Sequence, residues 1–416
     1  MFTNNRGQAT RPFTVVAKPT GAACNLDCSY CFFLSKETLW DSSQQRMTSE
    51  ALTIYLTRFL EAQPDGLVSL CWQGGEPTLR GLGFFREVAR LANELKRPTQ
   101  TVQQTFQTNG TLLDDQWGEF LAEENALVGI SIDGPDWLHD DYRVNKAGRG
   151  THAQVVRGWE VLQRHGVDAN ILCTVNSRNA EHPQTVYRYF RDDLGARHLQ
   201  FIPIVERVAG GEEEVAEAGW KATDGNYVLY RQNGTGVSSR TVAPEQYGEF
   251  LVTIFDEWVL CDVGTVFVQD FDVMLGAVFG HYSMCVQAPE CGTAIAMEHN
   301  GDIYSCDHYV EPGYRLGNIG EMSFPEALEL PAQREFGRSK RTALPTQCLQ
   351  CPVRWACHGG CPKDRFTMTT AGEPGLNFLC SGYFRFFTHA TPTVLAMANL
   401  LAKGRPASDI MGNPVP

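Results

Sequence analysis

Three closely spaced cysteines near the N-terminus are the residues best suited to chemistry. Cys24, Cys28 and Cys31 have a C-x3-C-x2-C spacing in a loop that follows the apolar segment 13–17. Three thiolates can hold three irons of a four-iron cluster and leave the fourth iron without a protein ligand. An open coordination position is typical of a metal centre that does chemistry. A structural zinc site with a distant fourth ligand is the alternative for this spacing.

A second group of cysteines lies in the C-terminal part of the chain. Its eight members are Cys285, Cys291, Cys306, Cys348, Cys351, Cys357, Cys361 and Cys380. Eight thiolates are enough for two complete four-cysteine sites, although spacing alone leaves their partition open. Three further cysteines, Cys71, Cys173 and Cys261, are expected to serve as packing residues.

The remaining composition limits where the protein works and what it binds. Residues 1–11 are polar, with no apolar core of a secretory signal, and no apolar run reaches membrane-spanning length. We therefore expect a cytoplasmic protein, where the 14 cysteines stay reduced and act as metal ligands. A secreted disulfide protein is the alternative. The net charge of -13 argues against a nucleic-acid partner, and we expect no membrane partner.

Strand-like and helix-like segments alternate from residue 13 to about residue 206. The strand candidates are 13–17, 67–72, 102–106, 127–132, 169–174 and 198–204, and the helical patterns between them cover 52–60, 84–95, 114–124, 152–165 and 183–194. Repeated β-then-α units imply a parallel sheet with right-handed crossovers. The sequence thus predicts an α/β fold with a partial (β/α)6 barrel of the TIM type.

Polar, glycine-rich motifs follow these strands. They are Gln73-Gly74-Gly75-Glu76-Pro77, Gln107-Thr108-Asn109-Gly110, Ser131-Ile132-Asp133-Gly134-Pro135, Thr174-Val175-Asn176 and residues 203–206. Glycine and proline also mark ordinary turns. However, active sites of such barrels lie at the C-terminal ends of the strands, so we expect an active-site mouth there. Gln73 is a candidate substrate contact, with a hydrogen bond at the end of the sheet as the equal alternative.

The chain divides into five parts. We expect an N-terminal arm (1–12), the barrel (13–206), a connecting segment with helices (207–280), a cysteine-rich domain (281–385) and a C-terminal helix and tail (386–416). Within the cysteine-rich domain, the apolar segments around Asn300-Gly301 predict a β-hairpin with a type I′ turn.

These motifs resemble those of a known family. The C-x3-C-x2-C loop with Tyr30 before its last cysteine resembles the radical S-adenosylmethionine (SAM) enzymes. Gly74-Gly75-Glu76-Pro77 resembles that superfamily's site for the methionine amino group, and the eight C-terminal cysteines resemble its SPASM extension. The Cys306-Asp307 segment and the eight-cysteine spacing are similar to those of the anaerobic sulfatase-maturating enzymes. The resemblance covers nearly the whole chain.

The resemblance implies a set of cofactors and their binding residues. Cys24, Cys28 and Cys31 would hold the [4Fe-4S] cluster that cleaves SAM. The matching SAM contacts are Tyr30, Gly74, Gly75, Glu76, Ser131, Arg143 and Val205, the last standing where the family has leucine. Two auxiliary [4Fe-4S] clusters would bind to one set comprising Cys285, Cys291, Cys306 and Cys361 and a second set comprising Cys348, Cys351, Cys357 and Cys380.

The resemblance also implies a reaction. It is the oxidation of a peptidyl Cys (or Ser) in an unfolded sulfatase polypeptide to Cα-formylglycine, with Asp307 as proton acceptor and an external reductant such as flavodoxin or ferredoxin. A carboxylate that only stabilises a turn is the alternative for Asp307, and His308 beside it is expected to be structural. Two rival functions are a SPASM peptide maturase that forms thioether or carbon–carbon crosslinks and a zinc-rich binding module.

Overall fold

Six parallel strands form the centre of the molecule. The computed structural model describes residue 4, residues 8–40 and residues 46–412. Neighbouring strands pair in chain order and in parallel, which confirms the predicted partial barrel. The strands are β1 (Thr14–Ala17), β2 (Gly66–Trp72), β3 (Gln100–Thr108), β4 (Leu127–Ser131), β5 (Asp168–Val175) and β6 (His198–Pro203). β9 (Phe267–Val268) extends the β6 edge in parallel.

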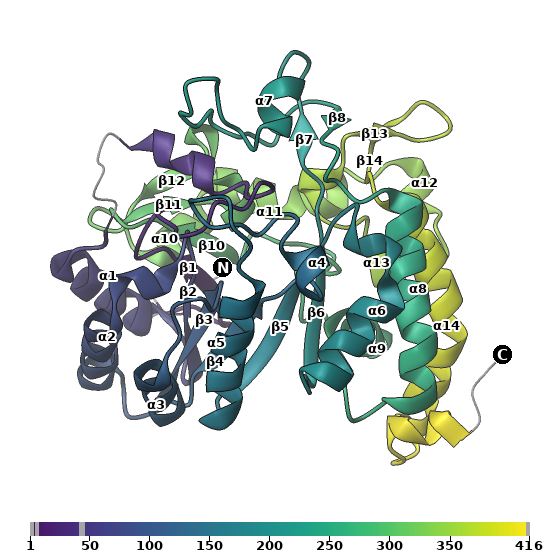
Figure 1. Cartoon of the computed structure of the whole chain (residues 1–416), viewed down its shortest axis with the longest axis horizontal. Coiled ribbons are helices and arrows are strands. Elements are labelled where there is room, and N and C mark those ends of the chain that lie inside the picture. The colour runs from purple at the N-terminus through teal and green to yellow at the C-terminus, as the bar shows by residue number, and fades with distance from the viewer. Residues whose placement is uncertain (1–3, 5–7, 41–45, 413–416) are drawn as a thin grey trace.

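Amphipathic helices connect and cover these strands (Figure 1). They are α1 (Ser49–Ala62), α2 (Leu82–Leu95), α3 (Asp115–Glu123), α4 (Asp136–His139), α5 (His152–Arg164) and α6 (Pro183–Arg188). Thr48 is the N-cap of α1, because its side chain accepts a hydrogen bond from the Ala51 amide. The predicted helix 183–194 ends its α-helical part at Arg188 and continues as a π-helical turn, Tyr189–Asp193.

The cysteine-rich part of the chain joins the same sheet, which its sequence does not predict. β10 (Ala294–Met297) lies beside β1 in parallel, and β11 (Asp302–Tyr304) and β12 (Arg315–Asn318) continue the sheet in antiparallel fashion. The expected hairpin is present, but the expected type I′ turn is wrong. Only Gly301 has a positive φ, of 85°, whereas a type I′ turn needs two such residues. Because the Glu298 amide still pairs with Asp302, the loop contains three residues.

Residues 207–243 form a small cap rather than an open linker. It contains β7 (Arg207–Val208), α7 (Glu213–Glu217) and β8 (Gly236–Val237), which lie at the top of Figure 1. Trp220 packs on Tyr230 inside the cap, with ring centroids 4.7 Å apart. Lys221 of the cap forms an ion pair with Asp27 of the cysteine loop. The cap is therefore anchored over the loop that carries Cys24–Cys31.

Two long helices line one side of the barrel. α8 (Pro244–Cys261) and α14 (Cys380–Ala402) run side by side (Figure 1). Gly248 and Gly382 permit the close approach, since a Cβ added at Gly248 would lie 2.7 Å from the Cα of Gly382. α14 begins at the last cysteine, Cys380, six residues before the expected C-terminal part (386–416). The remaining elements are α9 (Gln269–Val278), α10 (Phe324–Glu329), α11 (Pro331–Thr342), α12 (Thr346–Leu349), α13 (Arg354–Cys357), β13 (Thr367–Met368) and β14 (Pro374–Leu376).

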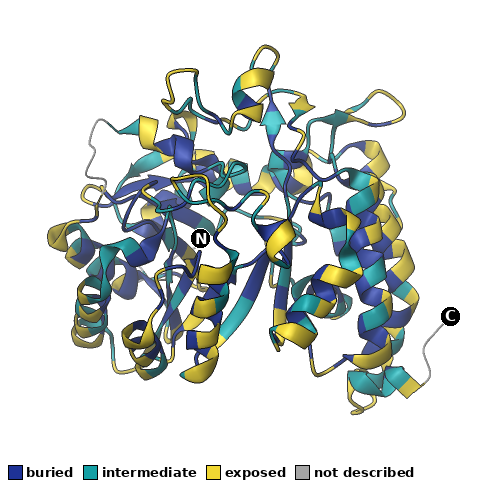
Figure 2. Cartoon of the chain, in the orientation of Figure 1, coloured by how far each residue is buried: buried dark blue, intermediate teal, exposed yellow. Residues whose placement is uncertain are grey.

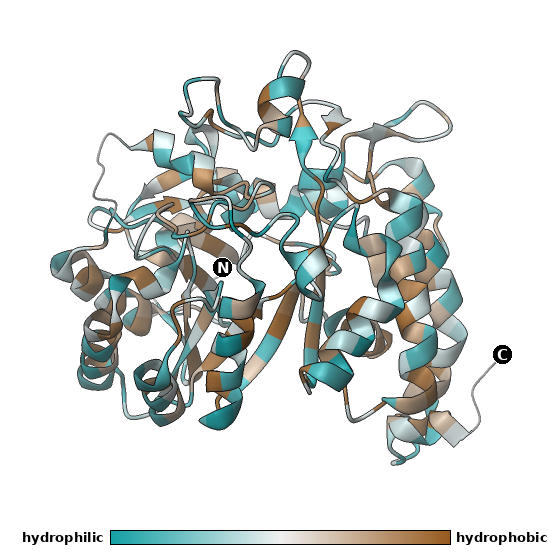
Figure 3. Cartoon of the chain, in the orientation of Figure 1, coloured by the Kyte–Doolittle hydropathy of each residue, from teal (hydrophilic) through white to brown (hydrophobic). Residues whose placement is uncertain are grey.

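The core follows from this layering. Buried residues concentrate on the strands and on the inner faces of the helices, while outer helix faces are exposed (Figure 2). Hydrophobic side chains follow the same faces, as on α8 and α14 (Figure 3). Among the described residues, no helix combines the length and the apolar character that crossing a membrane requires.

Candidate active site

The glycine-rich segment after β2 fixes the start of the cysteine loop. The Gly75 amide donates to the Gly21 carbonyl at 2.8 Å, and the Glu76 amide donates to the Ala23 carbonyl at 2.9 Å. A Cβ at Gly75 would overlap the Ala23 carbonyl, so only glycine allows this approach. Gly75 therefore sets the position of the chain one residue before Cys24.

The Glu76 carboxylate ties two strand ends together. It is fully buried. Its Oε1 accepts from the Thr78 amide at 3.0 Å, the Thr78 hydroxyl at 2.7 Å and the Thr108 hydroxyl at 2.7 Å, and its Oε2 accepts from the Asn109 amide at 2.8 Å. Burial raises the pKa of Glu76, and these donors oppose that rise. The side chain thus joins the loops after β2 and β3, and its carboxylate is already occupied by donors from the protein.

Polar groups surround the Cys24 sulfur. The Leu26 amide donates to Cys24 Sγ at 3.3 Å, and the Asn109 side-chain amide lies 3.7 Å from the same atom. Asn109 also donates to Asn25 Oδ1 at 2.9 Å. Hydrogen bonds to sulfur tune an iron–sulfur cluster, so Asn109 is a candidate for that role which the sequence reasoning did not single out.

The three loop cysteines suit a cluster by their chemistry. All three are free, partly exposed thiols. Burial raises the pKa of Cys28 to about 12 and also raises that of Cys24, to which the charges of Glu76 and Cys28 add. Free thiols with such pKa values stay protonated at neutral pH, whereas iron binds the thiolate. A positively charged metal group would therefore stabilise the thiolate forms of these three cysteines.

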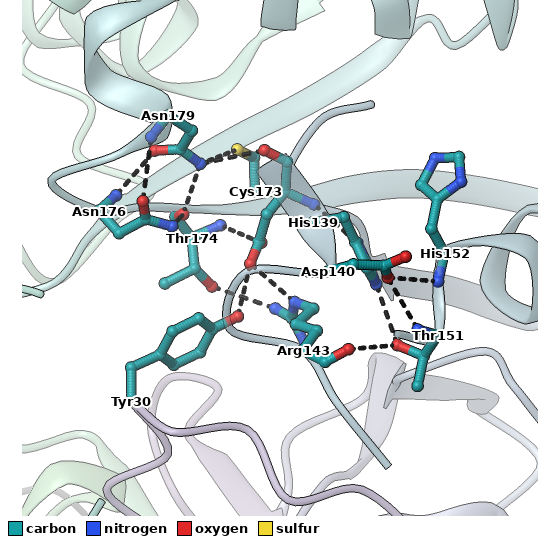
Figure 4. Close-up of polar contacts among 11 residues, drawn as sticks. Tyr30, His139, Asp140, Arg143, Thr151, His152, Cys173, Thr174, Asn176 and Asn179 are labelled. Carbon is teal, nitrogen blue, oxygen red and sulfur yellow. Dashed lines mark hydrogen bonds and ion pairs between the residues drawn. The ribbon is translucent and has the colours of Figure 1, made fainter. Parts of the chain in front are cut away.

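A buried charged cluster lies next to the Tyr30 hydroxyl (Figure 4). Asp133 Oδ2 accepts from the Tyr30 hydroxyl at 2.6 Å and from Arg143 Nε at 2.8 Å, while Oδ1 accepts from the Thr174 amide at 2.9 Å. Arg143 Nη2 also donates to the Thr174 hydroxyl at 3.2 Å. Burial disfavours the charge on Arg143, but Asp133, Tyr30 and Cys28 together outweigh it and raise the pKa of the guanidinium. Asp133 thereby orients Tyr30 and Arg143, two of the predicted SAM contacts.

His139 supports this cluster through hydrogen bonds (Figure 4). Its Nδ1 accepts from the Asp133 amide at 3.3 Å, and its Nε2 lies 3.2 Å from the Thr151 hydroxyl, which donates to the Arg143 carbonyl at 2.8 Å. This arrangement assigns the neutral tautomer with the proton on Nε2. Burial lowers the pKa of His139 well below its ordinary value, as a neutral ring requires.

The carboxylate of Asp307 lies at the same mouth. Asp307 follows Cys306 and forms an ion pair with the buried ammonium of Lys18, which follows β1. Burial opposes ionisation of Asp307, but the nearby positive charges, Lys18 foremost, together outweigh it and lower the pKa of the carboxyl. The His308 ring packs against Phe32, with centroids 5.5 Å apart, and burial lowers its pKa to about 4. The His308 ring is thus a neutral packing group beside Phe32.

The structure separates the eight C-terminal cysteines into two groups. Burial raises the pKa of the Cys306 thiol, and the nearby charges of Cys361 and Cys285 raise it further. Burial and the charge of Cys285 likewise raise the pKa of Cys291. Cys348, Cys351, Cys357 and Cys380 line one cavity of 540 Å³. The division into two ligand sets remains a prediction, and the cavity offers space for an inorganic group beside the second set.

The spacing within each group also bears on the kind of metal. Among the residues that the structure describes, no three His, Cys, Asp or Glu side chains converge as the ligands of a single ion do. A four-iron cluster does not need such convergence, because each thiolate binds a different iron. Each group contains four free thiols, which are the number and kind of donors that one four-iron cluster takes.

The remaining predicted contacts lie along the strand ends. Ser131 is the last residue of β4 and is half-buried, and Val205 is buried two residues after β6. Gln73 directly follows β2, and its amide donates to the Ala17 carbonyl. The sequence placed Asn109, Asp133 and Thr174 in motifs at the strand ends but gave them no individual role, and it did not single out Lys18. Their place at or just after the C-terminal ends of strands was the available signal.

Comparisons with known proteins agree with this geometry. The family model described as the radical SAM superfamily matches residues 19–190, and that described as an iron–sulfur cluster-binding domain, SPASM, matches residues 285–352. A serine-type anaerobic sulfatase-maturating enzyme of Bacteroides thetaiotaomicron is 41% identical over 405 residues, covering 96% of this chain and 95% of that relative. A cysteine-type anaerobic sulfatase-maturating enzyme of Clostridium perfringens is 32% identical, covering 93% of this chain and 99% of that relative.

A solved structure shows the same architecture. The structure described as native anSMEcpe with bound AdoMet and Cp18Cys peptide superimposes with a TM-score of 0.80 at 30% sequence identity. The match covers 93% of this chain and 99% of that chain. By sequence and by fold, this chain belongs to the anaerobic sulfatase-maturating enzymes, radical SAM proteins that carry a SPASM domain.

Proposed function

We propose that this protein oxidises a cysteine or serine side chain in an unfolded sulfatase polypeptide to Cα-formylglycine. The observation that carries the proposal is the meeting of two distant segments. Lys18 lies six residues before Cys24 and is paired with Asp307, which follows Cys306. A loop suited to generating a radical and a carboxylate suited to taking a proton therefore face one barrel mouth.

The residues that would hold the cofactors follow from the donor sets. Cys24, Cys28 and Cys31 would bind the SAM-cleaving [4Fe-4S] cluster, and the two C-terminal groups would bind one auxiliary [4Fe-4S] cluster each. When bound, SAM and these clusters supply a 5′-deoxyadenosyl radical and an acceptor for one electron. The backbone of Gly74–Glu76, together with Tyr30, Ser131, Arg143 and Val205, would orient SAM at the strand ends.

The chain supplies a carboxylate, Asp307, that can accept the proton lost from the substrate. Loss of a hydrogen atom from the substrate Cβ leaves one electron and one proton to be removed before the carbon–sulfur or carbon–oxygen double bond is complete. Asp307 would take that proton, since its lowered pKa keeps it a carboxylate at neutral pH. Its side chain is 17% exposed, so a bound peptide can reach it. Gln73, at the end of β2, is proposed to contact that peptide.

The partners and compartment are part of the same proposal. One-electron chemistry requires an external reductant, and a small redox protein such as flavodoxin or ferredoxin would serve. All 14 cysteines are free thiols, which supports work in the reducing cytoplasm.

An anaerobic assay tests the function. The reconstituted protein is incubated with SAM, a reductant and a sulfatase-type peptide in its cysteine and serine versions, and products are identified by mass spectrometry. We expect 5′-deoxyadenosine and formylglycine peptide together. A thioether or carbon–carbon crosslink would instead indicate the rival peptide maturase, and colourless, zinc-containing protein would indicate the binding module.

Two cysteine variants make the assay specific. Cys24→Ala is expected to abolish 5′-deoxyadenosine formation, because one cluster ligand is lost, while the C-terminal clusters still assemble. Cys261→Ala changes an exposed thiol outside both donor groups and serves as the matched control. SAM cleavage by Cys24→Ala at the wild-type rate would refute the assignment of this loop.

A further inference from the structure

We infer that Lys18 is a positioning residue for the oxidation step, which it serves by holding the carboxylate of Asp307 toward the reacting peptide. The inference rests on the proposed function, because it presupposes that Asp307 receives the substrate proton. It concerns a residue whose place in the sequence, at the end of β1 and before Pro19, suggests only a strand terminus.

The contact is a buried, directed ion pair. The Lys18 ammonium binds Asp307 through Oδ1. The lysine side chain is 1% exposed and the aspartate side chain is 17% exposed. Lys18 therefore approaches from the protein interior, and the exposed part of the carboxylate lies on the side that a peptide can reach. A carboxylate held at one oxygen cannot rotate freely about its side-chain bonds.

Lys18 is itself held in place by three neighbours. Its ammonium lies 3.6 Å from the centroid of the Phe33 ring, and its amide donates to the Met297 carbonyl at 2.9 Å. Gly74 leaves room for its stem, since a Cβ at Gly74 would lie 3.3 Å from Lys18 Cβ. The lysine is thus fixed between β10 and the segments that flank the cysteine loop, and its ammonium binds Asp307 from that position.

Loss of Lys18 should affect the two steps of the reaction differently. Hydrogen-atom removal from the peptide does not involve Asp307, whereas completion of the oxidation does. A displaced carboxylate should therefore leave radical formation intact and reduce only the later proton transfer, for which distance is decisive. A purely structural role of Lys18 would reduce both steps together.

The test measures both steps in one reaction. The Lys18→Met variant keeps an unbranched side chain of similar length but removes the charge. After reconstitution it is given SAM, a reductant and a peptide deuterated at the target Cβ. We expect deuterium in 5′-deoxyadenosine within about 2-fold of wild type and formylglycine per 5′-deoxyadenosine lowered by at least ~10-fold. Lys18→Arg should recover much of the ratio, since it keeps the charge.

Three further variants complete the design. Lys36→Met removes another buried lysine, which donates to the Tyr230 carbonyl at 2.6 Å and not to Asp307, so its ratio should equal that of wild type. Asp307→Asn should lower the ratio, and Lys18→Met combined with Asp307→Asn should be no worse than Asp307→Asn alone. Lys18→Gln, which is neutral and polar, replaces Lys18→Met in the measurement if Lys18→Met does not assemble its clusters.

Two results would overturn the inference. One is a wild-type ratio in Lys18→Met or Lys18→Gln. The other is a double variant whose loss equals the product of the two single losses, which would show that Lys18 acts independently of Asp307. Absence of formylglycine with the wild-type protein would instead refute the proposed function, so the two failures are distinguishable.

Discussion

Buried charges at this site are paired with specific partners. Asp133 is fully buried and binds Tyr30, Arg143 and the Thr174 amide through its two oxygens. Removing one member of such a pair leaves the other charge buried and unpaired, and this is usually much more damaging than loss of a surface pair. At the residue scale, Asp133 therefore matters through the two SAM-contact candidates that it orients.

Asp133→Asn tests this dependence. We expect the free energy of unfolding to fall by about 3 kcal/mol, because Arg143 loses its buried counter-charge. SAM binding should weaken as Tyr30 and Arg143 lose their common anchor. Urea unfolding and equilibrium binding of SAM measure the two effects. Asp141→Asn breaks the exposed pair with Arg178, whose atoms are 3.1 Å apart, and should cost less than about 1 kcal/mol. Equal losses in the two variants would contradict the argument.

At the scale of elements, the loop after β2 acts as a strap on the loop after β1. Two backbone hydrogen bonds, from Gly75 to Gly21 and from Glu76 to Ala23, join them. Glu76 then ties the strap to the loop after β3 through Thr108 and the Asn109 amide. Three strand ends are thereby fixed relative to Cys24, although each loop alone would be free to move.

Gly75→Ala should break the strap. The added methyl overlaps the Ala23 carbonyl, so the cysteine loop must shift. We expect iron per chain to fall by about a third, as one of three clusters is lost, and SAM cleavage to fall by about 100-fold or more. Iron analysis and 5′-deoxyadenosine yield are the measurements. Gly83→Ala, on α2 with open space at its Cβ position, is the control and should change neither value. Full iron content in Gly75→Ala would refute the strap.

At the scale of the whole molecule, one continuous sheet connects the barrel that carries the cysteine loop with the cysteine-rich domain. β10 pairs with β1 along its full length, so the chain after Met297 leaves the sheet beside Lys18. The cap over residues 207–243 adds a second link, through Lys221 and Tyr227 to Asp27. The stability of the site and that of the fold are consequently coupled.

Acid should weaken this fold through His139. The folded state keeps the ring neutral because burial lowers its pKa, whereas the unfolded chain takes up a proton below about pH 6.5. The unfolded state then binds more protons, so the free energy of unfolding falls as the pH decreases below about 6.5, by at most ~1.4 kcal/mol per pH unit. Urea unfolding between pH 5 and 8 measures this slope.

His139→Asn provides the comparison. Asparagine keeps an acceptor for the Asp133 amide but does not titrate. All other histidines are common to both proteins, so the difference between their pH profiles isolates His139. We expect the difference in free energy of unfolding between wild type and the variant to shrink as the pH falls below about 6.5. Parallel profiles would show that His139 is not kept neutral by the fold.

The sequence predicted the strands well because their signals are local. Strand-like segments that alternate with helical patterns marked all six barrel strands, and Thr48 marked the start of α1. It failed where conformation depends on distant contacts. The Asn300-Gly301 turn looked like a type I′ turn, yet the pairing of β10 with β1 accompanies a longer loop in which Asn300 keeps a negative φ. The short α4 was missed because four residues carry too little periodicity.

What the sequence alone determined is the kind of chemistry. Cysteine type and spacing are properties of the chain, and they indicated metal centres with an open position on the first. The resemblance of these and neighbouring motifs to a known family then implied three iron–sulfur clusters. The tertiary structure decided how residues far apart in sequence meet. Lys18 and Asp307, 289 positions apart, form their ion pair only because β10 docks beside β1. Such a pairing depends on the packing of whole elements, which no local pattern encodes.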